Sequence, residues 1–172
     1  MIFGTKEHFA IECIINNSSD LESIFGHIAI WISKEQLGQL PLTVLLKTPV
    51  THFQDSIIQC GKRRQKKFET MNSSEVFNFL QAALWGEPEE NRSSIDIIEE
   101  YKEYEKFNIS TNFSESFDGE SLYLIEDDKK ERFIWRTFDS EQIKEIHLAL
   151  GTYEKIVQSF LDWFNNQVCQ AD

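Results

Sequence analysis

The chain has 172 residues, of which 41% are hydrophobic and 13% are aromatic, and this is enough to build one well-filled core. Such a composition argues against an intrinsically disordered chain, and a formal net charge of −12 argues against a surface that attracts nucleic acid or anionic membrane. Internal repeats and low-complexity linkers are missing from the sequence. We therefore expect a single α+β domain over residues 1–172, with a mostly antiparallel sheet covered by amphipathic helices.

Two strands that form a hairpin are predicted near the N-terminus. Residues 9–15 (FAIECII) and 25–32 (FGHIAIWI) are rich in β-branched and aromatic side chains, and a polar Asn-Asn-Ser-Ser-Asp turn lies between them. In the second run Ile28, Ile30 and Ile32 fall on one face, which is the alternation expected of a strand. A third strand is predicted over Leu42–Leu46.

A first helix is predicted from the Thr48-Pro49 pair to about Gln59, because threonine can cap a helix and proline suits its first turn. A run of cations follows this helix: Lys62, Arg63, Arg64, Lys66 and Lys67. Such a run favours nucleic acid, but it lacks interleaved aromatic side chains for base stacking. A solvated loop or a loop that faces a protein partner explains it more simply.

Two more helices are predicted in the middle of the chain. Asn72 and Glu75 have the spacing of a capping box, and the apolar residues that follow keep helical spacing up to Gly86 and Pro88. From Ser93 to Lys106 a wide charged face accompanies apolar residues at every third position, namely Ile95, Ile98, Tyr101 and Tyr104. This pattern predicts an exposed amphipathic helix.

The stretch Phe117–Arg136 predicts a β-hairpin. Leu122–Ile125 and residues 133–135 are two short apolar runs, and a charged connection separates them. Aromatic and β-branched residues fall on both faces of these runs, so we expect the hairpin to lie inside the sheet. Asn108–Phe113 is a further candidate strand that leads into it.

The C-terminal part of the chain is predicted to be helical. Asp139 can cap a short helix over Ser140–Ile146. Thr152 is the predicted cap of the last helix, whose apolar stripe is wide enough to cover a sheet: Tyr153, Ile156, Val157, Phe160 and Phe164.

The sequence lacks a glycine-rich phosphate loop, a nucleophile elbow and an H-E-x-x-H motif. Its cysteines lack the C-x-x-C spacing of a zinc site. His147 lies in a predicted apolar segment, where a structural imidazole is the simpler interpretation. We predict no enzyme, no cofactor and no metal site, with a hydrolase built from dispersed carboxylates and His147 as a remaining alternative.

The N-terminus, MIFGTKEHFA, has neither the basic nor the apolar region of a secretory signal, and the longest apolar run, Phe25–Ile32, is too short to cross a bilayer. Three cysteines, an odd number, do not suggest a disulfide framework. We therefore expect a cytoplasmic protein without a membrane partner.

Acidic residues concentrate in one quarter of the chain. Between Glu87 and Glu131 there are fifteen acidic residues and five basic ones. A field of this sign favours a basic partner, although a solvated surface that maintains solubility is the alternative. Asp127 and Asp128 belong to this acidic part, and beside two lysines in the hairpin connection they are most simply turn residues.

Three mainly apolar and aromatic stretches carry a resemblance to a known family: the opening MIFGTKEHFAIE, the central FDGESLYLIED with RFIWR, and the closing LALGTYEKIVQSFLDWF. They resemble the immunity protein 42 family of bacterial polymorphic-toxin and contact-dependent inhibition systems. Residues 49–106 do not take part in this resemblance. It implies a small cytoplasmic protein that protects its own cell by binding the toxic domain of a cognate effector.

We therefore predict an immunity protein that binds a cognate toxin domain, of a basic nuclease type, by direct protein-protein contact. A toxin that acts on nucleic acid tends to present a basic cleft, which an acidic face reaches quickly and blocks. The predicted toxin-facing acids are Glu99, Glu100, Glu103, Asp127 and Asp128. An RNA-binding or regulatory protein that uses the basic loop 62–67 is the alternative.

Overall fold

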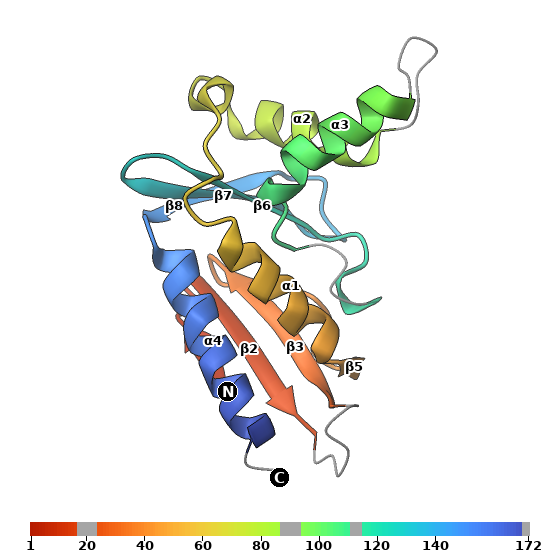
Figure 1. The fold of residues 1–172 in the computed structure, drawn as a ribbon, viewed down its shortest axis with the longest axis vertical. Coiled ribbons are helices and arrows are strands. Elements are labelled where there is room, and N and C mark those ends of the chain that lie inside the picture. Colours follow the sequence, from red (N-terminus) through yellow and green to blue (C-terminus); the bar gives the residue numbers. More distant parts are fainter. Residues whose placement is uncertain (17–23, 87–93, 111–114, 170–172) are drawn as a thin grey trace.

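Two antiparallel sheets and four α-helices make up the part of the chain that the computed structural model describes, residues 1–16, 24–86, 94–110 and 115–169 (Figure 1). The first sheet holds β1 (Ile2–Gly4), β2 (Phe9–Ile15), β3 (Phe25–Ile32), β4 (Glu35–Leu37) and β5 (Val44–Leu45). Strands β4 and β5 both pair with β3. The second sheet has the order β6 (Ser121–Glu126), β7 (Lys130–Arg136) and β8 (Lys144–Ala149).

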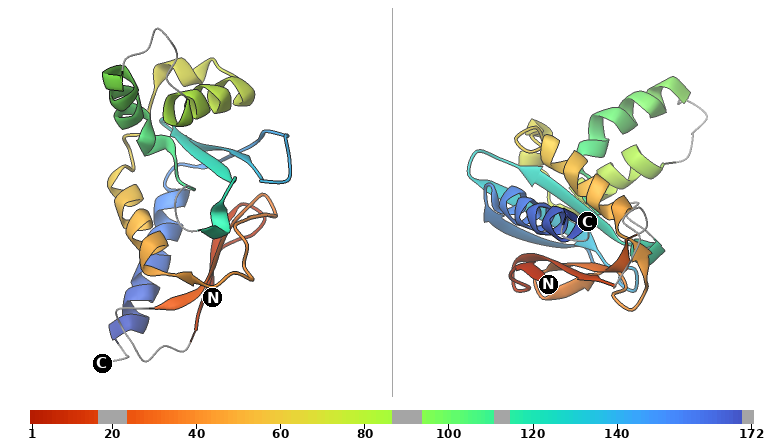
Figure 2. Two further views of the ribbon diagram at one scale, coloured as in Figure 1. Left: turned by 90° about the vertical axis from the view of Figure 1, so that its right-hand side faces the viewer. Right: turned by 60° about the horizontal axis from the view of Figure 1, so that its bottom comes forward.

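The helices form two pairs at different places in the elongated molecule. Helices α1 (Lys47–Ile58) and α4 (Thr152–Cys169) lie over the first sheet, whereas α2 (Ser73–Trp85) and α3 (Ser94–Tyr104) lie at the far end, beyond the second sheet (Figures 1 and 2). Short 3₁₀ helices join these elements: η1 (Lys66–Glu69), η2 (Glu105–Phe107) and η3 (Glu115–Phe117). No helix in the described ranges is both long enough and apolar enough to cross a membrane.

The second sheet separates two hydrophobic clusters. One of its faces joins the cluster formed by α1, α4 and the first sheet, through Leu122, Leu124, Phe133 and Trp135. Its other face joins the cluster around α2 and η2, through Tyr123, Ile125 and Ile134. Because successive strand residues point to opposite faces, the hairpin needs apolar side chains at nearly every position. The predicted hairpin over Phe117–Arg136 is therefore confirmed, with both faces covered.

The position of this hairpin within the sheet differs in part from the prediction. Strand β7 is central, because it pairs with β6 on one side and β8 on the other. Strand β6 lies at the edge, where an isolated bridge joins Asn108 to Tyr123. Of the strand predicted over Asn108–Phe113, residues 111–113 lie outside the described residues, and the described part contributes this bridge.

The two strands predicted near the N-terminus are confirmed with their boundaries. Strands β2 and β3 pair in antiparallel fashion along their whole length. Ile28, Ile30 and Ile32 are at most 1% exposed, as their shared face predicts. The strand predicted over Leu42–Leu46 is confirmed for Val44–Leu45. Most of the polar turn between β2 and β3 lies outside the described residues.

Helix α2 confirms its predicted capping box. The backbone N–H of Glu75 donates to the Asn72 side chain at 3.0 Å, and the backbone N–H of Asn72 donates to the Glu75 carboxylate at 2.8 Å. These bonds satisfy two N–H groups that a helix start leaves without intrahelical partners. Gly86 follows the last helical residue as predicted, and Pro88 lies outside the described residues.

Helix α1 begins at Lys47, earlier than the start predicted from Thr48 as the cap. Its N-cap is Leu46, which has no side-chain cap. Thr48 lies within the first turn, so the prediction that its hydroxyl caps the helix is wrong. Pro49 also falls in the first turn, where its missing N–H costs no hydrogen bond.

The helix predicted over Ser140–Ile146 is wrong, because this part of the chain enters strand β8. The residues of β8 alternate between partly buried and exposed, and Ile146 and Leu148 pack on the first cluster. Strand β7 offers six pairing partners to this alternating segment. Tertiary pairing therefore outweighs the local capping signal of Asp139.

Helix α4 confirms its apolar stripe, since four of its inward side chains are at most 6% exposed: Tyr153, Val157, Phe160 and Phe164. Its first N–H groups are satisfied by a residue that sequence analysis did not identify. The backbone N–H groups of Gly151 and Tyr153 each donate to the Glu131 carboxylate of β7 at 2.8 Å. The hydroxyl of Thr152, the predicted cap, instead donates to the Ala149 carbonyl at 2.6 Å.

Candidate partner-binding surface

The segment that joins α1 to η1 carries the basic run Lys62–Lys67, and its cations have two different environments. Arg63 is 0% exposed. Its neighbours Lys62 and Arg64 are exposed, as are Lys66 and Lys67. A buried charge is tolerated when it is paired and hydrogen-bonded, so the contacts of Arg63 decide what this segment does.

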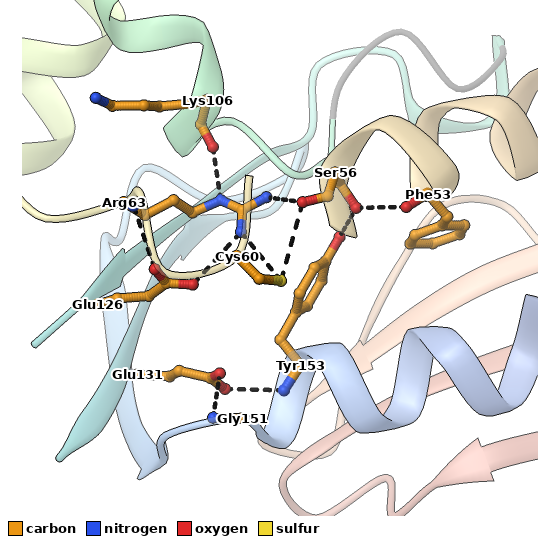
Figure 3. Close-up of polar contacts among 9 residues, drawn as sticks. All are labelled: Phe53, Ser56, Cys60, Arg63, Lys106, Glu126, Glu131, Gly151 and Tyr153. Atoms are coloured by element: carbon orange, nitrogen blue, oxygen red, sulfur yellow. Dashed lines mark hydrogen bonds and ion pairs between the residues drawn. The ribbon is translucent and has the colours of Figure 1, made fainter. Parts of the chain in front are cut away.

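Arg63 finds its acceptors on three elements (Figure 3). Its Nε donates to the Lys106 carbonyl of η2 at 2.6 Å, and its Nη2 donates to the Ser56 carbonyl of α1 at 2.7 Å. Its Nη1 lies 3.5 Å from Oε1 of Glu126, the last residue of β6. The Glu126 Oε2 accepts the backbone N–H of Arg63 at 3.2 Å. Glu126 is itself 4% exposed, so the two charges compensate each other inside the protein.

Tyr153 extends this network to α4. Its hydroxyl lies 2.7 Å from the Ser56 Oγ, which donates to the Phe53 carbonyl at 2.9 Å. Burial raises the pKa of Tyr153 to about 12, so the phenol stays neutral at pH 7. The network joins α1, η2, β6 and α4, and we name it the buried seam: Ser56, Arg63, Lys106, Glu126 and Tyr153. Its polar groups are engaged with one another, which suits it to holding the layers together.

Two exposed cations of the basic run also have partners within the protein. Arg64 forms an ion pair with Asp128. The Lys67 Nζ donates to the Tyr104 hydroxyl at 2.5 Å and lies 3.6 Å from the centre of the Phe79 ring. Together with Arg63, three of the five cations are thus engaged in internal contacts. This weakens the interpretation of loop 62–67 as an RNA-binding element.

Three of the predicted toxin-facing acids lie on one side of α3. Glu99 and Glu103 are exposed, and Glu100 is partly buried. Because an α-helix turns by roughly 100° per residue, these three positions fall within about a third of a turn. The Glu103 carboxylate accepts a hydrogen bond from Gln65 Nε2 at 3.0 Å.

The other two predicted acids form the turn between β6 and β7. The Asp127 Oδ1 accepts the backbone N–H groups of Lys129 and Lys130 at 2.6 and 2.7 Å, and these bonds hold its pKa below the ordinary value. The Asp128 side chain stays 87% exposed beside Arg64. Since Arg64 and Gln65 contact Asp128 and Glu103 respectively, the structure places both groups of acids beside one short segment.

Sequence analysis did not identify the exposure of the apolar residues of α3. Residues spaced by three drift around a helix, and nine positions place Ile95 about half a turn from Tyr104. The exposed fractions follow this drift, from 68% at Ile95 through 52% at Ile98 and 38% at Tyr101 to 6% at Tyr104. The exposed helix predicted over Ser93–Lys106 is confirmed, but three of these four side chains face solvent. The three-residue spacing was the signal that could have revealed this.

His147, the residue named for the hydrolase alternative, lies on strand β8 beside the carboxylate of Glu145. Glu145 and His147 share one face of it, because alternate residues of a strand point to the same side. Glu145 forms an ion pair with Arg132 at 2.8 Å. Within the described ranges, no three His, Cys, Asp or Glu side chains gather closely enough to hold a metal ion.

Comparisons with known proteins agree with the fold and extend the resemblance. A family model described as immunity protein 42 matches residues 1–163, which include the stretch 49–106 that sequence analysis left unassigned. The crystal structure of CdiI from Burkholderia dolosa AUO158 has a TM-score of 0.73 at 16% sequence identity, over 94% of this chain and 99% of that chain. No curated protein matches the chain. The structural similarity confirms the predicted α+β fold.

Proposed function

The chain belongs to the immunity protein 42 family, and on this basis we propose that it neutralises a cognate toxin by binding the toxic domain directly, without catalysis of its own. The observation that carries the proposal is the family match over residues 1–163. The partner is a basic, nuclease-type toxin domain, and the complex forms in the cytoplasm with one copy of each protein.

The charge of the chain supports a basic partner. The net charge is −12. Glu99, Glu103, Asp127 and Asp128 are exposed, and Glu103 and Asp128 contact the neighbouring residues Gln65 and Arg64. Opposite charges steer two proteins toward each other at low salt, so these acids accelerate the encounter with a basic domain. In the complex they compete with the phosphate groups of the toxin's substrate.

The first test asks whether the upstream neighbouring gene encodes a large secreted protein with a variable C-terminal domain, and expresses the chain together with that domain in a toxin-sensitive host. We expect growth to be restored and the two proteins to purify as a 1:1 complex. Rescue without a complex would contradict direct binding. Failure to rescue cells from a domain shown to be toxic would contradict protection against that partner.

The second test maps the acidic face by removing charge while keeping the hydrogen-bonding shape. The variant replaces Glu99, Glu100 and Glu103 with Gln and Asp127 and Asp128 with Asn, because Asn can still accept the turn N–H groups. A matched control neutralises five acids elsewhere: Glu7, Asp118, Glu141, Glu154 and Asp162. We expect the association rate at low salt to fall about tenfold for the first variant and less for the control. Equal rates for the two variants would contradict the assigned face.

A further inference from the structure

Four large apolar side chains are exposed on α3 and at the end of α1 that faces it (Figures 1 and 2). Ile58 at the end of α1 is 63% exposed, and Ile95, Ile98 and Tyr101 of α3 are 68%, 52% and 38% exposed. Single exposed apolar residues are ordinary on protein surfaces, but a row of them beside a hollow marks a binding site.

A cavity of about 390 Å³ lies between the C-terminal half of α1 and the segment where α3 ends and η2 begins. Ile58 and Tyr101 line it from opposite helices, and Asp55 and Glu105 bring exposed carboxylates to its rim. Ile98 and Ile95 continue the apolar row along α3, away from the cavity. The surface therefore combines two apolar walls with negative charge at its edge. We name Ile58, Ile95, Ile98 and Tyr101, together with the cavity, the α1–α3 groove.

The buried seam supports this groove from below. Ser56, Arg63 and Lys106 line the cavity, and their hydrogen bonds fix α1 relative to η2, which directly follows α3. The Lys106 ammonium points away from Ser56 in Figure 3 and lies 5.3 Å from the Phe107 ring. The Arg63 charge is compensated by Glu126. A preformed groove loses less conformational entropy on binding, which favours a long-lived complex.

The acids beside the groove identify the chemistry of the occupant. Asp55 and Glu105 lie at the cavity. Glu99 lies about 40° around the helix from Ile95 at the other end of the apolar row, so a ligand that follows the row meets carboxylates at both ends. A segment with an apolar side chain flanked by Lys or Arg satisfies both features, because charge complementarity fixes its register and the apolar anchor is removed from water.

We propose that the α1–α3 groove holds an apolar side chain of the toxin that is flanked by Lys or Arg, and that this contact determines how slowly the complex dissociates. The proposal rests on the proposed function. It assigns separate tasks to the two sides of α3, because rim charges mainly set the association rate and buried anchors mainly set the dissociation rate.

The test measures the kinetics of binding to the cognate toxin domain, identified by the rescue experiment, for Ile58→Ala, Ile98→Ala and Tyr101→Ala. We expect the dissociation rate to rise about tenfold or more for Tyr101→Ala and less for each isoleucine variant, with association rates within about twofold of wild type. Ile14→Ala is the matched control, because Ile14 is 45% exposed on β2, away from α3. Circular dichroism and thermal unfolding establish that each variant is folded.

Unchanged dissociation for all three groove variants, with a wild-type complex that forms normally, would overturn the groove and leave the proposed function intact. A wild-type protein that neither binds nor protects against an active toxin would overturn the proposed function itself. A change in the oligomeric state of the free protein on Ile98→Ala, with unchanged toxin dissociation, would identify a second copy of the chain as the occupant and overturn the proposal.

Discussion

The buried seam and the α1–α3 groove are adjacent, and each departs from the rule that charged side chains face solvent and apolar side chains are buried. In the seam, Arg63 and Glu126 place opposite charges in the interior, at 0% and 4% exposure. In the groove, Ile58 and Ile98 place apolar side chains in solvent, at 63% and 52% exposure. Ser56, Arg63 and Lys106 belong to both, since they line the cavity from the seam side.

The difference between the two regions lies in where each side chain finds its partner. Arg63 and Glu126, the two buried charges of the seam, are partners within the same chain, so the seam contributes to the fold. The apolar row of the groove has no equivalent cover in the described residues, and burial of that surface requires a second molecule. Substitutions should therefore affect stability in the seam and binding in the groove.

The largest expected effect is that of Arg63→Ala. The substitution leaves the buried Glu126 carboxylate without its cation, so we expect the free energy of unfolding to fall by about 3–5 kcal/mol. Urea unfolding followed by tryptophan fluorescence measures this loss. Arg64→Ala is the control from the next position in the chain, and because its partner Asp128 is 87% exposed we expect a loss below about 1 kcal/mol. Equal losses for the two variants would contradict the distinction between seam and surface.

These two arginines show what the sequence can and cannot predict about the site. Adjacent positions in a basic run have the same composition around them, and nothing local distinguishes Arg63 from Arg64. Their roles depend on Glu126 and Asp128, which lie more than 60 positions away in sequence. Long-range pairing of this kind is fixed by the packing of the sheet against α1, and it becomes visible once the fold is known.

The fold itself was more predictable wherever local patterns were strong. The capping box of Asn72 and Glu75, the stripe of α4 and the hairpin over Phe117–Arg136 all depend on residues close together in the chain. Strand β8 was missed because its alternation is short and a capping signal at Asp139 competed with it. The exposure of Ile95, Ile98 and Tyr101 was not predicted, because residues with a spacing of three drift around the helix and only Tyr104 reaches the buried side.

A smaller effect on stability is expected at Glu120, a partly buried acid outside the seam. Its carboxylate accepts backbone hydrogen bonds, whereas Glu126 in the seam is paired with an arginine. Burial raises its pKa from 4.5 to about 7, opposed by hydrogen bonds from Gly38 and Phe138. Because the folded state binds this proton more tightly than the unfolded state, the stability contributed by Glu120 rises as the pH falls from about 7 toward 4.5. Glu120→Gln should therefore be more stable than wild type at pH 8, by about 1–2 kcal/mol after allowance for solvent screening.

The measurement for Glu120 is the difference in Tm between the variant and wild type across pH 4.5 to 8. We expect the difference to shrink as the pH falls, since the wild-type carboxyl becomes protonated. A difference that stays constant with pH would show that Glu120 does not titrate in this range in the folded protein.

Tyr153→Phe should have an effect of about 1 kcal/mol, because it removes one buried hydrogen bond of the seam and preserves the aromatic packing. The Ser56 hydroxyl keeps its bond to the Phe53 carbonyl, so the substitution leaves no donor of Ser56 without a partner. Thermal unfolding measures the loss. A loss as large as that of Arg63→Ala would indicate that the seam acts as one cooperative unit rather than through its ion pair.

The smallest expected effect on stability is that of Ile98→Ala, below about 0.5 kcal/mol, because the side chain is 52% exposed and alanine favours a helix. Two measurements on this variant are informative together. We expect the midpoint of urea unfolding to stay at the wild-type value and dissociation from the toxin domain to become faster. Arg63→Ala should give a large loss of stability, and because Arg63 also fixes α1 relative to η2, the folded protein should dissociate from the toxin somewhat faster as well. A clear loss of stability for Ile98→Ala would mean that the apolar row of α3 is covered within the chain, and the groove would then belong to the fold rather than to a partner.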